Sequence, residues 1–152
     1  MTLKKIKLLN GPNLNLLGFR EPEIYGKTTL PEVEESCAKA AKLCHFDLSA
    51  FQTNDEAELI AALHSCLTDG TAGLIINPGA FAHTSIALRD AAAALAIPKV
   101  EVHISNIFAR ESFRHHSYLS GAVNSVITGA GVQGYLLALN ILERLLNKTS
   151  HN

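Results

Sequence analysis

Hydrophobic and polar positions follow two alternating patterns along this chain. Short apolar or every-second-residue segments predict strands at residues 3–9, 46–53, 73–77, 98–106 and 122–128. Between them, apolar residues recur at helical spacing and predict helices over residues 29–44, 54–67, 84–95 and 134–146. Strands that alternate with helices, without internal repeats or low-complexity linkers, predict a single α/β domain over residues 1–152 with a doubly wound parallel sheet.

Local signals mark the ends of several expected elements. The sequence Thr29-Leu-Pro-Glu32 gives a capping box with proline in the first turn. Either Thr84 or Ser85 caps the third helix, and Pro98 ends it. The strand at residues 73–77 is a continuous apolar run up to its last residue, as in a parallel strand that is covered on both faces. It therefore belongs near the centre of the sheet.

The segment between the first strand and the first helix is unusually long. Asn10-Gly11-Pro12 stops the strand, and the helix signal begins only after Lys27. Connections from a strand to a helix usually have about two to six residues. We therefore expect this segment to be a functional lid or a binding loop.

The fourth expected strand combines an apolar face with a chemically reactive one. Valine or isoleucine occupies positions 100, 102 and 104, and Glu101, His103 and Ser105 alternate with them on the opposite face. Arg110 and Arg114 follow on a polar turn. Two interpretations are open: a site at the carboxyl end of a strand, or an edge strand with one solvated face beside a basic surface loop.

The expected topology favours the first interpretation. In open α/β sheets, ligands bind beyond the carboxyl ends of the strands, at the point where the strand order reverses. For the order 2-1-3-4-5, that point lies among strands one, three and four. The segments that follow these strands, residues 10–25, 77–83 and 103–114, carry the most chemically reactive side chains of the sequence. We therefore expect three polar clusters to meet in one crevice.

Composition narrows the class of partner. The 152 residues are 47% hydrophobic, enough for one sizeable core, and 13 basic residues nearly cancel 14 acidic ones. A near-neutral chain does not suggest nucleic acid or an acidic membrane as its partner, so we expect a small molecule. Three cysteines without a C-x-x-C pair suggest free thiols, and no apolar run approaches the ~20 residues of a membrane span. These features predict a cytoplasmic protein.

Tyr25 and Arg20 lie together in the long first loop and suggest a catalytic base. A nearby cation favours the charged form of a phenol, which then accepts a proton. For this segment taken alone, a tyrosine packed at the end of a loop beside an exposed arginine remains the alternative. Asn13 and Asn15 also have a structural alternative, as turn residues beside glycine and proline.

Two histidines follow the third and fourth strands in different settings. His103 has Glu101 two residues earlier on the same strand face, so the carboxylate can orient the imidazole ring as a general acid requires. His83 follows Asn77 and precedes the start of a helix, where a local hydrogen-bonding role is as common as a catalytic one. The pair His115-His116 has no third ligand at metal spacing and receives no metal role.

Other chemistries fit the sequence poorly. The run from Gly129 to Gly134 matches a dinucleotide fingerprint, but only 18 residues follow it, so a tight turn and close helix packing explain its glycines better. A flavin-binding module, the non-enzymatic alternative, lacks a phosphate loop after the first strand. A Schiff-base enzyme needs a desolvated lysine in the crevice, whereas Lys5, Lys7 and Lys99 lie away from the carboxyl ends of the strands.

The candidate residues stand in four strings of sequence. These are GPNLNLLG at residues 11–18, REPEIYG at 20–26, NPGAFAHTS at 77–85 and EVHISNIFARESFRHHSYLS at 101–120. In residue identity, order and spacing they resemble the type II 3-dehydroquinate dehydratases, and the resemblance covers nearly the whole chain. A minor departure occurs at Ala130, where the family usually has leucine.

The resemblance implies a flavodoxin-like three-layer sandwich with a five-stranded parallel sheet in the order 2-1-3-4-5. It implies a hydro-lyase of the shikimate pathway that uses no cofactor and no metal. The reaction would be the dehydration of 3-dehydroquinate to 3-dehydroshikimate by anti elimination through an enolate. The family forms a homododecamer, a tetramer of trimers, and this subunit number rests on the resemblance alone.

Catalytic roles implied by the resemblance fall on Tyr25, His103, Arg20, Asn13, Arg110 and Glu101. The tyrosine would be the base that removes a C2 proton, and the two arginines would hold it as a phenolate. The asparagine would position a water against the enolate oxygen. The histidine, oriented by the glutamate, would protonate the departing C1 hydroxyl.

The same resemblance assigns the substrate contacts. Asn77, His83 and Arg114 would bind the ring hydroxyls. The backbone of Ile104 and Ser105, together with the Ser105 hydroxyl, would hold the substrate carboxylate. Asp90 would reach into the site from a neighbouring subunit.

Overall fold

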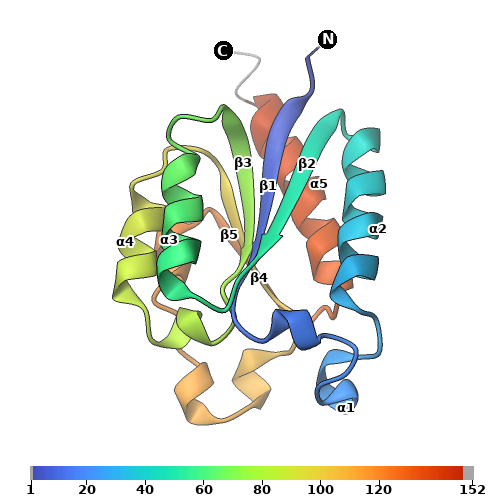
Figure 1. Cartoon of the computed structure of the whole chain (residues 1–152), viewed down its shortest axis with the longest axis vertical. Coiled ribbons are helices and arrows are strands. Elements are labelled where there is room, and N and C mark those ends of the chain that lie inside the picture. The colour runs from blue at the N-terminus through green and yellow to red at the C-terminus, as the bar shows by residue number, and fades with distance from the viewer. Residues whose placement is uncertain (1, 149–152) are drawn as a thin grey trace.

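The computed structural model describes residues 2–148, which form three layers with a parallel sheet in the middle (Figure 1). The strands lie in the order β2-β1-β3-β4-β5. They are β1 (Lys4–Asn10), β2 (Phe46–Gln52), β3 (Thr71–Asn77), β4 (Lys99–His103) and β5 (Ser125–Thr128). The expected fold class and strand order are therefore confirmed.

Helices cover both faces of this sheet. One face carries α2 (Leu30–Leu43) and α5 (Gln133–Lys148), and the other carries α3 (Glu56–Ser65) and α4 (Ile86–Ala93) (Figure 1). Leu8 and Ile75 enter the core under the first pair of helices, whereas Leu9 and Ile76 enter the core under the second pair. Neighbouring residues of one strand thus pack on opposite faces, which explains the continuous apolar run in β3 and the adjacent leucines near the end of β1.

The helix starts follow the expected capping chemistry. Thr29 caps α2, because its hydroxyl oxygen accepts a hydrogen bond from the Glu32 backbone N–H at 3.4 Å. Of the two candidate caps of α4, Ser85 has this role, and its hydroxyl oxygen accepts from the Leu88 backbone N–H at 2.9 Å. Each bond satisfies a backbone donor that has no partner within its helix.

Several element ends differ from the prediction. α3 ends before Leu67, which is 59% exposed and takes no part in the apolar stripe expected of it. α4 ends at Ala93, before Leu95. Leu95 is nevertheless buried, so the apolar spacing of the helix continues beyond its end. β5 begins only at Ser125, because residues 120–122 form a 3-10 turn. Apolar residues in turns that pack against the core are indistinguishable by spacing from the ends of helices and strands.

β4 is an interior strand, so its interpretation as a solvated edge strand is wrong. It pairs with β3 on one side and β5 on the other, and all five of its residues are buried. Its polar side chains, Lys99, Glu101 and His103, are therefore largely removed from water. Buried polar groups of this kind require hydrogen-bond partners inside the protein.

The long first loop is folded. It contains a 3-10 turn at Leu14–Leu16 and the short helix α1 (Pro22–Tyr25). Gly11, at its start, leaves no space for a side chain, because a Cβ atom there would lie 2.3 Å from the carbonyl oxygen of Pro78. This close approach brings the first loop against the loop that follows β3, at the lower end of the sheet in Figure 1.

The glycines of the fingerprint-like run serve a turn and close helix packing, as predicted. Gly129 and Gly131 have φ values of 85° and 63°, in the left-handed region that favours glycine. A Cβ atom on Gly134 would lie 3.2 Å from Cγ1 of Val102, so this glycine lets α5 pack closely against β4. The run closes the chain onto the sheet.

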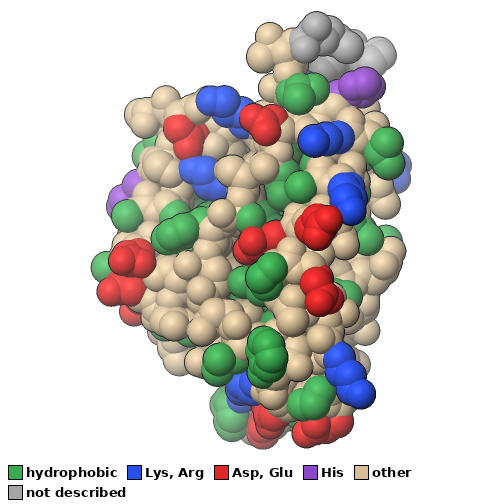
Figure 2. All heavy atoms as spheres, turned by 45° about the vertical axis from the view of Figure 1, so that its right-hand side comes forward, with side chains coloured by type: hydrophobic (Ala, Val, Ile, Leu, Met, Phe, Trp, Pro, Cys, Tyr) green, Lys and Arg blue, Asp and Glu red, His purple; other side chains and the backbone are tan. Residues whose placement is uncertain are grey.

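The face that carries α2 has a mixed charge pattern. Figure 2 shows basic and acidic side chains interspersed over this face, with hydrophobic side chains between them. On the part of the surface drawn in colour there, lysines and arginines gather into no continuous stripe. A polyanion such as nucleic acid would need such a stripe, so this face is not suited to bind one.

Candidate active site

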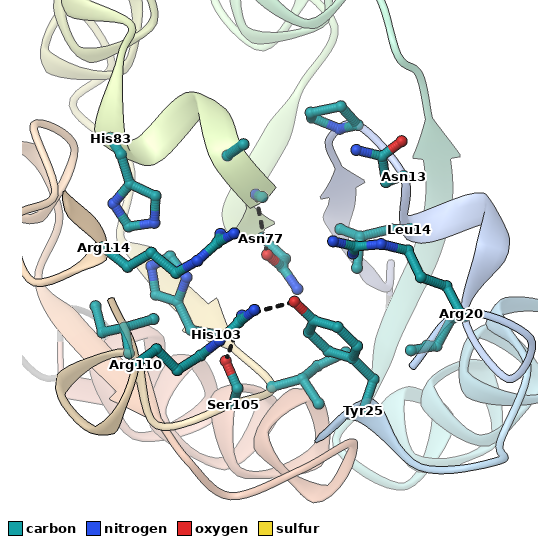
Figure 3. A pocket seen from close by; sticks show the side chains of 16 residues that line it. Asn13, Leu14, Arg20, Tyr25, Asn77, His83, His103, Ser105, Arg110 and Arg114 are labelled. Atoms are coloured by element: carbon teal, nitrogen blue, oxygen red, sulfur yellow. Dashed lines mark hydrogen bonds between the residues drawn. The ribbon is translucent and has the colours of Figure 1, made fainter. Parts of the chain in front are cut away.

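A pocket opens at the carboxyl ends of β1, β3 and β4, where the three predicted segments meet (Figure 3). Its lining consists of Pro12, Asn13, Leu14, Leu17, Arg20, Tyr25, Asn77, Gly79, Ala80, His83, His103, Ile104, Ser105, Ile107, Arg110 and Arg114. All the predicted site residues are in this set except Glu101 and Asp90. The position agrees with the rule that ligands of doubly wound sheets bind where the strand order reverses.

Tyr25 lies between two guanidinium groups. Nη1 of Arg110 donates a hydrogen bond to the Tyr25 hydroxyl oxygen at 2.6 Å, and also to the Ser105 hydroxyl oxygen at 3.3 Å. The Cζ atoms of Arg20 and Arg110 lie 5.2 and 5.3 Å from the centroid of the tyrosine ring. Two positive charges and a charge-assisted hydrogen bond stabilise a negative charge on the phenol oxygen.

His103 is fixed from behind by a buried carboxylate. Its Nε2 atom forms a short hydrogen bond with Oε2 of Glu101, whose side chain is fully buried. The two residues are two positions apart on β4, so their side chains share one face of the strand. Glu101 does not line the pocket and acts through His103, as the sequence predicts for an orienting group.

His83 stacks on His103 at the edge of the pocket. The two ring centroids are 6.1 Å apart, and Nδ1 of His83 lies 2.8 Å from the backbone carbonyl oxygen of His116. Burial lowers the pKa of His83, which favours the neutral ring at neutral pH. With Nδ1–H donating to this carbonyl, Nε2 is left as an acceptor for a hydroxyl group.

Asn77 is held by groups on both sides of its amide. Its Oδ1 atom accepts from the Gly79 backbone N–H at 3.1 Å, and its Nδ2 atom donates to the Tyr135 hydroxyl oxygen at 2.9 Å. The Tyr135 hydroxyl in turn donates to Oδ1 of Asn10 at 2.7 Å. Burial raises the pKa of Tyr135, so this second tyrosine stays a neutral hydroxyl and a structural link.

The remaining polar lining residues are also held by local contacts. Nε of Arg114 donates to Oε2 of Glu111 at 2.7 Å. Asn13 has a φ of 68°, and its backbone N–H donates to Oδ1 of Asn54 at 2.9 Å. This left-handed conformation is one that asparagine tolerates better than most residues. The Arg114 side chain and the Asn13 backbone are thus each held in place at the pocket.

Asp90 lies outside the pocket of its own chain. It is on α4, its side chain is 69% exposed, and its Oδ1 atom lies 3.4 Å from Nη1 of Arg89. An exposed carboxylate on an outer helix cannot contact a ligand bound in this pocket. Its assignment to the site of a neighbouring subunit stays a prediction.

Several residues that complete the site were not singled out from the sequence. Apolar walls come from Leu14, Leu17 and Ile107, and the hydrogen-bonding support comes from Asn10, Ser117, Ser120 and Tyr135. Ser117 and Ser120 lie inside one of the four strings of sequence, at residues 101–120, so the sequence did offer a signal by which they could have been found. Tyr135 carried no such signal, because its partner Asn10 is 125 positions away in the sequence.

The described residues, 2–148, contain neither a cluster of metal-ligand side chains nor a helix suited to span a membrane. In that range, no group of three or more histidine, cysteine, aspartate or glutamate residues is arranged to hold a metal ion. None of the helices there is long and apolar enough to cross a membrane. The Nε2 atom of His115 lies 2.9 Å from the Arg110 backbone carbonyl oxygen, so this histidine has a hydrogen-bonding partner in the backbone.

The fold and the pocket together define an α/β enzyme whose site presents groups suited to acid–base chemistry on a small molecule. A phenol between guanidinium groups and a carboxylate-bound imidazole face one cavity, as proton removal and proton donation require. The family described as dehydroquinase class II matches residues 4–143. The chain belongs to this family.

Similar proteins support this assignment along most of the chain. A 3-dehydroquinate dehydratase from Legionella pneumophila (strain Corby) is 56% identical over 140 residues, which are 92% of this chain and 97% of the relative. The crystal structure of a type II dehydroquinase from Propionibacterium acnes has a TM-score of 0.89 and 44% identity, covering 93% of this chain and 97% of that one. A second, from Butyrivibrio crossotus DSM 2876, has a TM-score of 0.91 and 40% identity, covering 93% and 99%. The family expected from the four strings is confirmed.

Proposed function

We propose that this chain dehydrates 3-dehydroquinate to 3-dehydroshikimate in the shikimate pathway, by anti elimination through an enolate intermediate. The observation that carries the mechanism is the placement of Tyr25 and His103 in one pocket, the first beside Arg20 and Arg110 and the second against Glu101. An elimination of this kind needs a base and an acid that act on different atoms of the substrate. Family membership supplies the substrate class.

The first step is removal of a C2 proton by the Tyr25 phenolate. C2 is next to the substrate ketone, so the electron pair of the broken C–H bond moves onto the carbonyl oxygen and forms the enolate. Arg20 and Arg110 place positive charge beside the phenol oxygen, where a negative charge is needed for the step. Asn13, at the pocket wall, positions a water that donates a hydrogen bond to the enolate oxygen.

The second step is loss of the C1 hydroxyl as water. His103 gives a proton to this hydroxyl while the enolate electron pair re-forms the ketone and makes the C1–C2 double bond. The Glu101 carboxylate accepts the Nε2–H hydrogen bond and holds the ring in place. Tyr25 then releases the proton it took up to solvent and His103 takes one up from solvent, so both side chains regain their starting states without a cofactor.

Substrate binding uses the rest of the lining. Asn77, His83 and Arg114 face the cavity and suit the ring hydroxyls, because they offer amide, imidazole and guanidinium groups. The backbone of Ile104 and Ser105 and the Ser105 hydroxyl suit the carboxylate. In a dodecamer built as a tetramer of trimers, Asp90 of a neighbouring subunit completes each site.

A direct test is an absorbance assay on the purified, metal-stripped protein. With 3-dehydroquinate and no added cofactor, we expect absorbance to rise at the ultraviolet band of a conjugated enone acid. Product identity is checked by chromatography against 3-dehydroshikimate. Absence of product from a folded protein would exclude the proposed function.

A second expectation concerns the competing Schiff-base route. None of the described lining residues is a lysine, and Lys7 is bound to Asp69 at 2.5 Å away from the pocket. We therefore expect that borohydride added with substrate traps no covalent adduct and leaves activity unchanged after its removal. Intact-protein mass spectrometry measures this, and a mass increase corresponding to reduced substrate would restore the lysine route.

A further inference from the structure

We propose that Ser117 and Ser120 are positioning residues, which fix the Glu101 carboxylate and through it the orientation of His103. The inference rests on the proposed function for its kinetic consequence, whereas its structural part stands by itself. Neither serine lines the pocket. They act from behind the catalytic side chain, on the carboxylate that the ring contacts.

Glu101 is a carboxylate without a cationic side chain beside it apart from His103. Its side chain is 0% exposed, and none of the ion pairs found in residues 2–148 joins it to a lysine or an arginine. A buried carboxylate is costly unless hydrogen bonds replace the water it has lost. The donors that satisfy it therefore decide where it points.

The two serine hydroxyls supply these donors, one for each carboxylate oxygen. Oγ of Ser117 donates to Oε2 of Glu101 at 2.9 Å, and Oγ of Ser120 donates to Oε1 at 3.0 Å. Oε2 also accepts the hydrogen bond from the Nε2 atom of His103. With both oxygens engaged, rotation of the carboxylate would break at least one bond to a buried group, so its plane is fixed.

The backbone determines the direction of these hydroxyl bonds. The Ser117 oxygen accepts the Leu119 backbone N–H at 3.2 Å, which leaves its own proton to point at Glu101. The same segment is tied to the pocket side, because the Tyr118 backbone N–H donates to the Ala82 carbonyl oxygen at 2.8 Å. The segment that carries both serines is thus fixed against Ala82, the residue that precedes His83.

This arrangement sets the tautomer of His103. A carboxylate fixed opposite Nε2 requires Nε2 to carry a hydrogen, so Nδ1 is the ring nitrogen that remains for the substrate. Removing the hydroxyls leaves the carboxylate free to turn, and the ring loses its fixed partner. Misplacement of a catalytic group by about 1 Å costs on the order of a hundredfold in rate.

The test compares the parent protein with a double variant that carries both Ser117→Ala and Ser120→Ala. We expect kcat for 3-dehydroquinate to fall about ten- to hundredfold while KM stays within about twofold, since the serines do not contact the pocket. The variants Ser117→Thr and Ser120→Thr keep the hydroxyl and should restore most of the rate. Ser125→Ala is the matched control, because the Ser125 side chain makes no hydrogen bond to the described residues.

A second readout does not depend on turnover. Heteronuclear NMR of labelled protein distinguishes a ring nitrogen that carries hydrogen from one that does not, and His103→Asn identifies the His103 signals among the 7 histidines. We expect the parent to show hydrogen on Nε2 and the double alanine variant to show a mixture of the two tautomers. Unfolding measured by circular dichroism checks that the variant is folded.

The outcomes separate this inference from the proposed function. An unchanged kcat, or an unchanged His103 tautomer in the folded double variant, would overturn the role of the serines while leaving the reaction in place. A parent protein that does not convert 3-dehydroquinate would instead overturn the proposed function. In that case the tautomer measurement still decides whether the serines position His103.

Discussion

Tyr25→Phe is expected to lower the turnover of 3-dehydroquinate by about 10²–10⁴-fold, the usual contribution of a general base. The variant removes one oxygen atom, which is the one that accepts the 2.6 Å hydrogen bond from Arg110. Arg20 and Arg110 remain in the pocket, and the residues proposed to bind the substrate are unchanged. Binding of substrate should therefore be largely retained, within about tenfold.

The measurement combines steady-state kinetics with calorimetric binding of substrate to the inactive variant. Tyr118→Phe is the matched control, because the Tyr118 hydroxyl is outside the pocket lining and makes no hydrogen bond within residues 2–148. Its kinetics should equal those of the parent. If Tyr25→Phe turned over within about tenfold of the parent, Tyr25 would not be the base.

His103→Asn should also abolish dehydration, by about 10²–10⁴-fold, but at a different step. Tyr25 would still remove the C2 proton, and the enolate would form without an acid to assist departure of the C1 hydroxyl. The enolate then takes a proton back from Tyr25. In D2O, the variant should therefore exchange the C2 proton of 3-dehydroquinate for deuterium without making product.

Proton NMR of the substrate measures this exchange directly. Tyr25→Phe should show neither exchange nor product, which makes it the internal control for the assignment of the two roles. A His103→Asn protein that is folded and binds substrate but exchanges no deuterium would contradict a stepwise path through the enolate. The two variants together place each proton transfer on one side chain.

The sequence predicted the architecture well because its signals came from the sheet. β3 is covered on both faces, so its apolar run is continuous and easy to recognise, and β1 ends in adjacent leucines for the same reason. The errors fall at element ends. Leu67 and Leu95 keep apolar spacing beyond their helices, and the residues before Ser125 form a turn in place of a strand. Tertiary contacts decided these boundaries, and spacing does not report them.

The candidate site was predictable to a similar degree. Its lining residues follow three strands, and the rule for doubly wound sheets brings the carboxyl ends of these strands together. The buried support was not predictable in the same way. Ser117 and Tyr135 reach Glu101 and Asn10 across 16 and 125 positions of sequence. Such bonds become visible only when the chain is folded.

The buried Tyr135 hydroxyl has a consequence for protein engineering. It joins the first turn of α5 to the ends of β1 and β3, through Asn10 and Asn77. A shortened chain that stopped before α5 (Gln133–Lys148) would lose an anchor of a pocket residue as well as the cover of one sheet face. Truncation, circular permutation or fusion designs should therefore keep this helix joined to its own sheet.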